Sequence, residues 1–181
     1  MNPVDKNLKK KTVLEGTFED VIELDNHYYL VHKKDQICVL PYTISSEGLL
    51  DKIGVIEDWN YIEEEKALVL LNDYINTDDT SDLIAANRIL FEIIGSNVKD
   101  ANLWMYLGSV YNNMSSDSPI KLYAVNISNV EVKTDEEVED KEDRKKFKMM
   151  DSSSVLQTDD ILFLAAYLRL FQYFYVNSLK K

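Results

Sequence analysis

The sequence predicts a single domain of the α/β (α+β) class, with a mixed sheet between layers of helix and a long helix at the C-terminal end. Three observations support this prediction. With 181 residues and 45% hydrophobic side chains, the chain can bury a substantial core. Its first third is rich in strand-forming residues, and two long apolar segments, 82–95 and 161–176, have the length of helices.

Strands are expected where short runs of β-branched, aromatic or alternating residues end at turn residues. Asp25 and Asn26 supply the first turn, between two strand-forming segments. Pro41 should end its strand or place it at a sheet edge, because proline cannot donate a ladder hydrogen bond. The expected strand segments are 12–24, 27–31, 36–42, 53–57, 66–71, 103–111 and 120–127.

Charged segments divide the chain further. Residues 1–11 are expected to form a basic N-terminal arm, and residues 12–181 the single domain. Within that domain, 134–148 is an acidic insertion, with seven acidic and four basic side chains between positions 134 and 146. This segment is either a solvated loop or short helix, or a docking element for a basic partner.

Composition excludes several classes of protein. A formal net charge of −12 argues against nucleic acid as the principal ligand, because phosphates are repelled by such a surface. No uncharged apolar run reaches the length of a membrane span, and the first residues lack the apolar core of a signal peptide. The single Cys38 permits neither a disulfide framework nor a cysteine metal site, which indicates an intracellular origin. No cofactor is expected.

Residues 82–95 carry the most specific motif. They resemble the helical half of the Nudix box, G-x5-E-x7-R-E-U-x-E-E-x-G-U, where U is a bulky aliphatic residue. Arg88 matches the motif arginine, Glu92 the first glutamate of the pair and Gly95 the closing glycine. The resemblance implies a Nudix-like α/β/α sandwich over roughly residues 12–178. Segments 104–108 and 122–125 look like strands of the ADP-ribose-pyrophosphatase-like subgroup.

The departures from the box concern its acidic residues. Ile89 and Ile93 stand where two glutamates belong, and Tyr74 and Thr80 fall on the opening glycine and first glutamate. Nudix enzymes hydrolyse nucleoside diphosphates linked to another group, with divalent cations held by these glutamates. Because Glu92 alone cannot hold such a cation, the sequence predicts no catalytic and no metal-binding residues. Asp78, Asp79 and Asp82 could replace them only if the preceding loop is rearranged.

The replacements also make the box helix apolar on a second face. Ala85, Ile89 and Ile93 are four residues apart and share one stripe, which should be buried. Arg88 and Glu92 have the same spacing and are expected to form a surface ion pair. A buried core helix without Nudix ancestry is the alternative interpretation of the same stripe.

The C-terminal helix is predicted over residues 159–178, with Thr158 as its N-cap. It carries more aromatic surface than one domain face readily covers, and such residues are enriched in interfaces. Packing entirely within the domain remains the alternative. The candidate interface residues are Phe163, Tyr167, Phe171, Phe174 and Tyr175 on this helix, with Lys9, Lys10 and Lys11 on the arm.

The sequence is therefore interpreted as a non-catalytic structural or interaction subunit of a larger assembly, either a homo-oligomeric ring or a hetero-complex. The favoured assembly is a bacteriophage virion, built in the host cytoplasm, with this chain in the neck, portal-proximal ring or capsid accessory layer. One alternative is an active Nudix-type pyrophosphatase with displaced metal ligands. Another is a regulatory module that binds a nucleotide without cleaving it.

Overall fold

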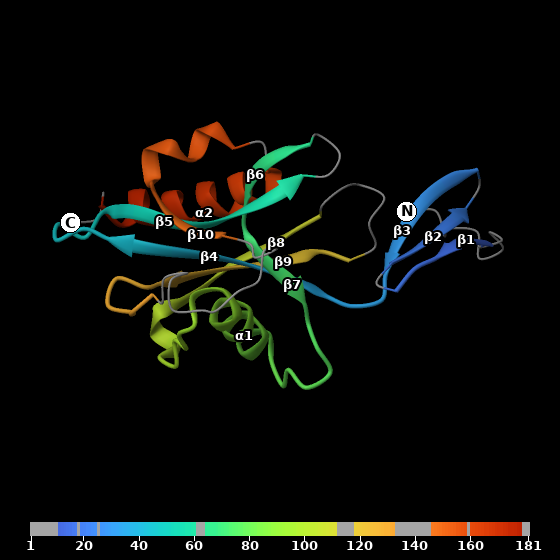
Figure 1. The fold of residues 1–181 in the computed structure, drawn as a ribbon, viewed down its shortest axis with the longest axis horizontal. Coiled ribbons are helices and arrows are strands. Elements are labelled where there is room, and N and C mark those ends of the chain that lie inside the picture. The colour runs from blue at the N-terminus through green and yellow to red at the C-terminus, as the bar shows by residue number, and fades with distance from the viewer. Residues whose placement is uncertain are drawn as a thin grey trace.

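The computed structural model contains two β-sheets and two α-helices in the part of the chain that it describes (Figure 1). Neither of these helices combines the length and apolar character that a membrane crossing needs. The described residues are 11–17, 19–24, 26–60, 64–111, 118–132, 146–158 and 160–178.

The larger sheet forms the centre of the molecule and is mixed. Its strand order is β10-β5-β4-β9-β8, with β6 paired to β5 and β7 paired to β4. Only the β4–β9 pair is parallel among these pairings. The strands are β4 (Gln36–Ile44), β5 (Leu50–Asn60), β6 (Glu65–Val69), β7 (Leu71–Tyr74), β8 (Trp104–Val110), β9 (Ile120–Asn126) and β10 (Lys146–Asp151).

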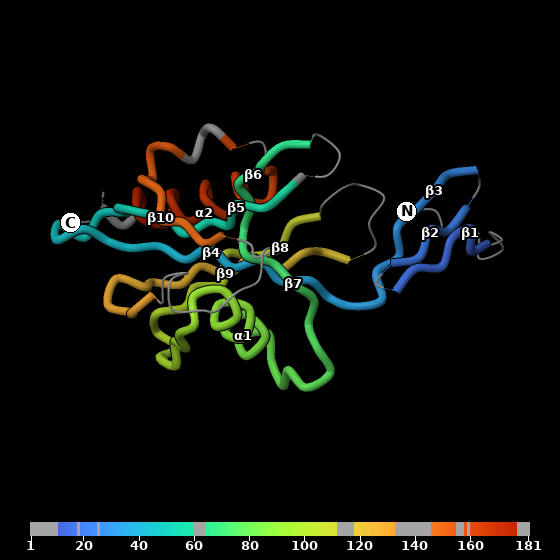
Figure 2. Tube along the Cα trace, in the orientation of Figure 1, coloured from blue at the N-terminus to red at the C-terminus, as the bar shows by residue number. Residues whose placement is uncertain are grey.

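The first strands form a separate antiparallel sheet, seen at one end of the molecule in Figure 2. It consists of β1 (Lys11–Glu15), β2 (Glu19–Leu24) and β3 (His27–His32). Asn26 makes the predicted turn with a positive φ of 61°, a conformation that asparagine tolerates. The Tyr74 hydroxyl of β7 donates to Glu19 Oε1 at 3.4 Å and links the two sheets.

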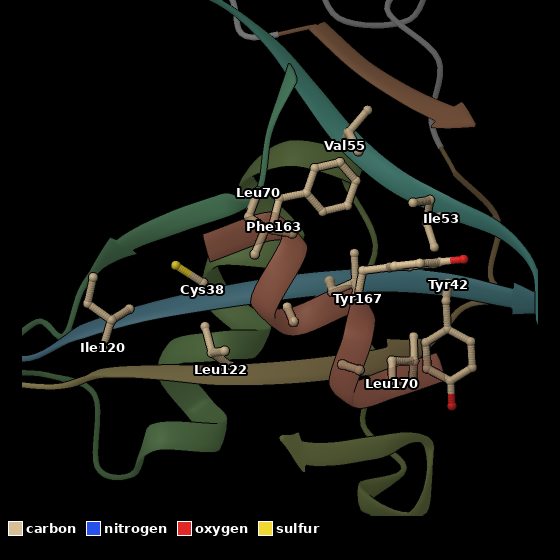
Figure 3. Packing of buried hydrophobic residues seen from close by; sticks show 13 residues of the cluster. Cys38, Tyr42, Ile53, Val55, Leu70, Ile120, Leu122, Phe163, Tyr167 and Leu170 are labelled. Atoms are coloured by element: carbon tan, nitrogen blue, oxygen red, sulfur yellow. The ribbon is translucent and has the colours of Figure 1, made fainter. Parts of the chain in front are cut away.

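Helices cover opposite faces of the larger sheet, as Figure 1 shows for α1 (Asp82–Ile94) and α2 (Ile161–Ser178). Alternate residues of β4 explain the arrangement, because successive strand side chains point to opposite faces. Ile37 and Val39 pack in the cluster of α1. Cys38 and Leu40 pack in the cluster of α2, where Phe163, Tyr167 and Leu170 point toward the sheet (Figure 3). The predicted α/β/α sandwich is confirmed.

Pro41 lies inside β4, so the prediction that it ends its strand or marks an edge is wrong. Residues 36–39 of β4 pair with β7, whereas Tyr42 and Ile44 pair with β5. Pro41 falls between these two partners and beside an irregularity in the register. A proline is tolerated where the ladder changes partner.

The predicted strand 66–71 is two strands interrupted at Leu70, which is buried and tied to the start of α2. The Leu70 N–H donates to Asp160 Oδ2 at 3.3 Å, and the Leu68 carbonyl accepts from Thr158 Oγ1 at 3.0 Å. Asp160 also caps α2, since its Oδ1 accepts from the N–H of Leu162 at 2.8 Å. The helix therefore begins at Ile161, and Thr158 is not its N-cap.

Strand β10 was not predicted, because its first residues fall in the segment assigned to the acidic insertion. It pairs with β5 over six residues. Strand β5 lies between β10 and β6, and its Glu57 forms ion pairs with Lys148 of β10 and Lys66 of β6. The hydrogen bonds that the two lysines donate to Glu57, with the larger effect from Lys148, lower the pKa of Glu57 to about 2. Positions 134–145 of the insertion lie outside the described residues.

A bulge in β8 is held by α2. The β8–β9 register shifts between Tyr106 and Gly108, and Gly108 adopts a φ of 94°. The Arg169 guanidinium donates to the carbonyls of Leu107 at 3.0 Å and Ser109 at 3.2 Å. A Cβ at Gly108 would lie 2.9 Å from Arg169 Nη1. The positive φ therefore favours glycine here, and a side chain at this position would also displace the Arg169 guanidinium.

Candidate functional site

A cavity of about 220 Å³ lies against the box helix α1, on the side where that helix meets β5 and β7. Its lining is mixed, with two carboxylates and one amide beside three isoleucines. Concave sites that combine apolar walls with a few polar groups are the usual ligand-binding sites of proteins. The lining residues are Ile56, Asn72, Asp73, Ile89, Glu92 and Ile93.

Local sequence explains where α1 begins and ends. Ser81 is its N-cap, and its Oγ accepts from the N–H of Ile84 at 3.3 Å. Gly95 ends the helix in the left-handed conformation, with φ of 69°, and its N–H donates to the Phe91 carbonyl at 2.8 Å. The closing glycine of the box resemblance is thus the C-cap that orients the last turn beside the cavity.

The apolar stripe of α1 is largely buried. Ala85 is fully buried and Ile89 is 2% exposed, whereas Ile93 is partly exposed at the cavity. Ile89 and Ile93 therefore differ in environment, although both replace box glutamates. Of these two positions, only that of Ile93 gives a side chain contact with both the cavity and solvent.

Arg88 joins three carboxylates, of which Asp73 and Glu92 line the cavity and Asp79 does not, and we call these four residues the Arg88 cluster. Its Nη1 donates to Asp73 Oδ2 at 2.8 Å and to Glu92 Oε1 at 3.1 Å, and its Nη2 donates to Asp79 Oδ2 at 3.1 Å. Nη2 also donates to the carbonyl of Tyr74 at 2.8 Å. The expected pair with Glu92 is present, but it is one contact of a larger network.

The network shifts the pKa of two of its members, Asp79 and Arg88. Burial alone would raise the pKa of the Asp79 carboxyl, but hydrogen bonds from Arg88 and the Asn76 N–H outweigh it and hold that pKa below its ordinary value. Burial likewise opposes the charged form of Arg88, and its bonds to Asp79, Asp73 and Glu92 raise its pKa overall. Asp79 is therefore held as a carboxylate and Arg88 as a guanidinium near neutral pH.

The acidic residue that the sequence missed is Asp73. It lies on β7, outside the box helix, and reaches the cavity because β7 pairs with β4 beneath α1. The three replacements considered from sequence do not line the cavity. Asp79 is bonded to Arg88, Asp82 to Lys121 at 3.0 Å, and Asp78 is exposed. Among the described residues, no group of three or more histidines, cysteines or acids could hold a metal ion.

The predicted interface residues of α2 separate into two groups. Phe163 is fully buried and Tyr167 is 9% exposed, so both belong to the core and cannot offer a surface to a partner. Phe174 is partly buried against Tyr42, with ring centroids 5.7 Å apart. Phe171 and Tyr175 are exposed, at 49% and 56%. Of the predicted lysines, Lys11 lies in exposed β1, whereas Lys9 and Lys10 lie outside the described residues.

Comparison with known proteins gives matches among solved structures alone. No family model matches the chain, and no curated protein matches it. The structure of an ADP compounds hydrolase matches with a TM-score of 0.65 and 15% identity, covering 94% of each chain. A NUDIX hydrolase of Listeria monocytogenes matches with a TM-score of 0.56 and 13% identity, covering 80% of this chain and 97% of that one.

NrtR of Shewanella oneidensis matches with a TM-score of 0.52 and 18% identity, covering 77% of this chain and 64% of that one. At these identities the likeness shows the fold, which is Nudix-like. The interpretation of the chain as a structural subunit of a virion is corrected by these findings, since the similar structures include hydrolases of this fold. The alternative of a Nudix-type site with displaced acidic residues fits them better, and the fold gives no support to the expectation of an inactive site.

Proposed function

We propose that the chain is a Nudix-type pyrophosphatase that hydrolyses a nucleoside diphosphate linked to another group, with acidic residues displaced from the box positions. The observation that carries this proposal is the cavity against α1, where Glu92 and Asp73 stand beside apolar walls. One carboxylate comes from the box helix and the other from β7. The likeness in fold to an ADP compounds hydrolase supports the substrate class.

A divalent cation fits these residues if it arrives with the substrate. Asp73 and Glu92 offer hard oxygen ligands, and Asn72 adds an amide oxygen at the same cavity. Mg²⁺ is commonly held by one or two carboxylates together with substrate phosphates rather than by a complete protein cage. A cation bound in this way would polarise the phosphate and activate water.

The residues of the chain would orient the reacting groups. Arg88 donates to one carboxylate oxygen of Asp73 and to one of Glu92, and these bonds hold both side chains in place. Neither bond uses the second oxygen of either carboxylate. Ile89 and Ile93 supply apolar walls that limit access of bulk water. At about 220 Å³ the cavity is smaller than most ligand pockets, which start near roughly 300 Å³. It therefore suits the diphosphate portion, with the nucleoside lying outside.

Nucleotide binding without cleavage is the second candidate, and the Arg88 cluster favours it. Both cavity carboxylates are already paired with a guanidinium, which weakens their attraction for a cation. The isoleucines at two box positions cannot act as general bases. A site of this kind could sense a nucleotide and leave it intact.

One set of variants separates these candidates. Purified protein with Mg²⁺ or Mn²⁺ is assayed against ADP-ribose, NADH, nucleoside triphosphates and diadenosine polyphosphates, with binding measured by calorimetry. We expect turnover that falls at least 100-fold in both Asp73→Asn and Glu92→Gln, the usual scale for loss of an acid–base or ligand group. Asp79→Asn is the matched control, because it weakens the Arg88 cluster without removing a cavity carboxylate.

The outcomes differ clearly. Turnover that survives both cavity substitutions would place the chemistry elsewhere and refute the proposed site. Binding without turnover, lost in Asp73→Asn but kept in Asp79→Asn, would establish the second candidate. Neither binding nor turnover for any compound of the set would contradict both.

A further inference from the structure

An aromatic side chain lies one strand away from the cavity wall. Phe147 of β10 pairs with Ile56 of β5, which lines the cavity. Directly opposed residues of neighbouring strands point to the same face of a sheet. Of the residues that pair with cavity-lining positions in the described strands, Phe147 alone is aromatic, and the others are Val69, Ile37 and Cys38. The sheet face that forms the cavity wall therefore continues onto an aromatic ring.

This ring lies at the margin of the core cluster under α1. The helix packs against β4 and β7, whereas Phe147 is on β10, and β5 lies between β10 and β4. Phe147 and Val69 are both partly buried against that cluster. Val69 of β6 pairs with Ile56 from the other side. Phe147, Ile56 and Val69 thus form an apolar row across three strands, with a cavity-lining residue at its centre, and we call it the β5 row.

Gly54 determines where the ring lies. It is two residues before Ile56 on β5, so both residues are on the same face of the sheet. A Cβ on Gly54 would lie 2.7 Å from both Cε2 and Cζ of Phe147, and 3.0 Å from Cβ of Pro41. Glycine inside a strand often marks a place where another group approaches the backbone closely. The missing side chain therefore lets the far end of the Phe147 ring lie over β5, beside the cavity wall.

The size and charge of the cavity indicate which group would contact this ring. At about 220 Å³ the cavity suits a diphosphate, so the nucleoside of the proposed substrate lies outside it. The two carboxylates, Asp73 and Glu92, are inside the cavity, where a cation would join them to the phosphates. The β5 row is uncharged and adjoins the cavity through Ile56. A nucleobase is flat and uncharged, and bases stack on aromatic side chains.

We propose that the β5 row binds the base of the nucleotide, with the base stacked on the Phe147 ring. This inference rests on the proposed function, because it assigns the nucleoside part of the same substrate. Phe147 is then a binding residue that contacts the base, whereas Asp73 and Glu92 act at the phosphates. The ring should therefore affect the affinity for a nucleotide and have no effect on the affinity for a diphosphate that carries no base.

The first test compares ADP with inorganic pyrophosphate, which has no base. Each compound is titrated into the full chain by calorimetry at one Mg²⁺ concentration. We expect Phe147→Leu to weaken ADP binding about 5- to 10-fold, the lower part of the range for loss of one stacked base, and to leave pyrophosphate binding unchanged. Phe147→Tyr keeps the ring and should keep the affinity for ADP. Phe91→Leu is the matched control, because Phe91 is 45% exposed on α1 and does not line the cavity.

The outcomes separate this inference from the proposed function. Weaker binding of ADP alone in Phe147→Leu, with Phe147→Tyr like wild type, supports the stacked base. Equal loss for ADP and pyrophosphate, or no loss for either, would overturn the inference and leave the diphosphate site standing. A wild type that binds pyrophosphate but not ADP would do the same. A wild type that binds neither compound would contradict the proposed function, and this inference with it.

The second test displaces the ring without replacing it. Gly54→Ala puts a methyl group 2.7 Å from two ring carbons of Phe147, so the ring must shift. ADP affinity should fall as it does in Phe147→Leu, with pyrophosphate binding unchanged. In the Phe147→Leu background, Gly54→Ala should weaken ADP binding by less than about 2-fold more, because both substitutions act on one contact. Effects that multiply in full would show that Gly54 acts independently of the ring and would overturn this placement of the base.

Discussion

Replacing Ile89 by glutamate would return a carboxylate to its box position while placing it in the core. Ile89 is 2% exposed and belongs to the core cluster between α1 and the sheet, together with Ile37, Val39 and Leu90. Glutamate is about as large as isoleucine and does not empty the site, but burying its neutral carboxyl without a partner should cost about 1–3 kcal/mol. That cost is a sizeable part of the roughly 5–15 kcal/mol by which domains are stable.

The buried carboxyl adds a dependence on pH. Burial disfavours the charged form, so the pKa of the new glutamate should rise in the folded state toward roughly 8, from about 4.3 in the unfolded state. Between these values the folded state binds the proton and the unfolded state releases it, so stability falls as pH rises. From pH 5.5 to 7.5 the Ile89→Glu protein should lose about 2–3 kcal/mol more than wild type, at 1.36 kcal/mol per unit.

Urea unfolding at several pH values measures this difference. Ile89→Gln is the neutral counterpart and should show the cost of burying a polar group without the added pH dependence. Ile84→Glu is the exposed control on the same helix, since Ile84 is 50% exposed, and it should change stability by less than about 1 kcal/mol. If Ile89→Glu unfolds like wild type at both pH values, the burial of this box position has been misjudged.

Two further predictions concern other parts of the fold. Gly108→Ala should destabilise by about 1–2 kcal/mol for its positive φ, and further because the Arg169 guanidinium must shift away from the carbonyls of Leu107 and Ser109. Gly48→Ala, also at positive φ but with open space around it, should show the strain alone. Equal melting temperatures of the two variants would refute the role of Arg169. Because the pKa of Glu57 is lowered to about 2, mainly by Lys148, its ion pairs should stabilise the fold fully above its ordinary pKa and lose that effect as pH falls toward 2. The difference in urea midpoint between wild type and Glu57→Gln should thus be constant above pH 6 and vanish in acid; a difference that persists at pH 2 would contradict it.

Much of the fold was predictable because its signals are local. The periodic strands and the two apolar helices depend on neighbouring residues, and the structure places them close to where the pattern predicted. Pro41 was misjudged because its tolerance depends on which strands pair with β4 on either side of it. The predicted N-cap, Thr158, lies two residues before the observed cap, Asp160. The hydroxyl of the buried Thr158 instead donates to the Leu68 carbonyl, at the interruption between β6 and β7.

The site was less predictable, for a physical reason. The box resemblance identified Arg88 and Glu92, four residues apart on one helix. Asp73 is 15 positions before Arg88, and the two meet only because β7 pairs with β4 below α1. A motif read at fixed spacing counts one carboxylate at this cavity, whereas the fold brings two there. The conclusion that the site is inactive depended on that lower count.

The charge of the Arg88 cluster determines which measurement of the site is most informative. One guanidinium faces three carboxylates, so the formal charge of the cluster is negative. A diphosphate without a counter-ion would be repelled from a cavity lined by Asp73 and Glu92. A divalent cation that comes with the substrate reverses this, since it binds both the carboxylates and the phosphates. Nucleotide affinity at this cavity should therefore depend steeply on Mg²⁺, and that dependence should weaken when either carboxylate is neutralised.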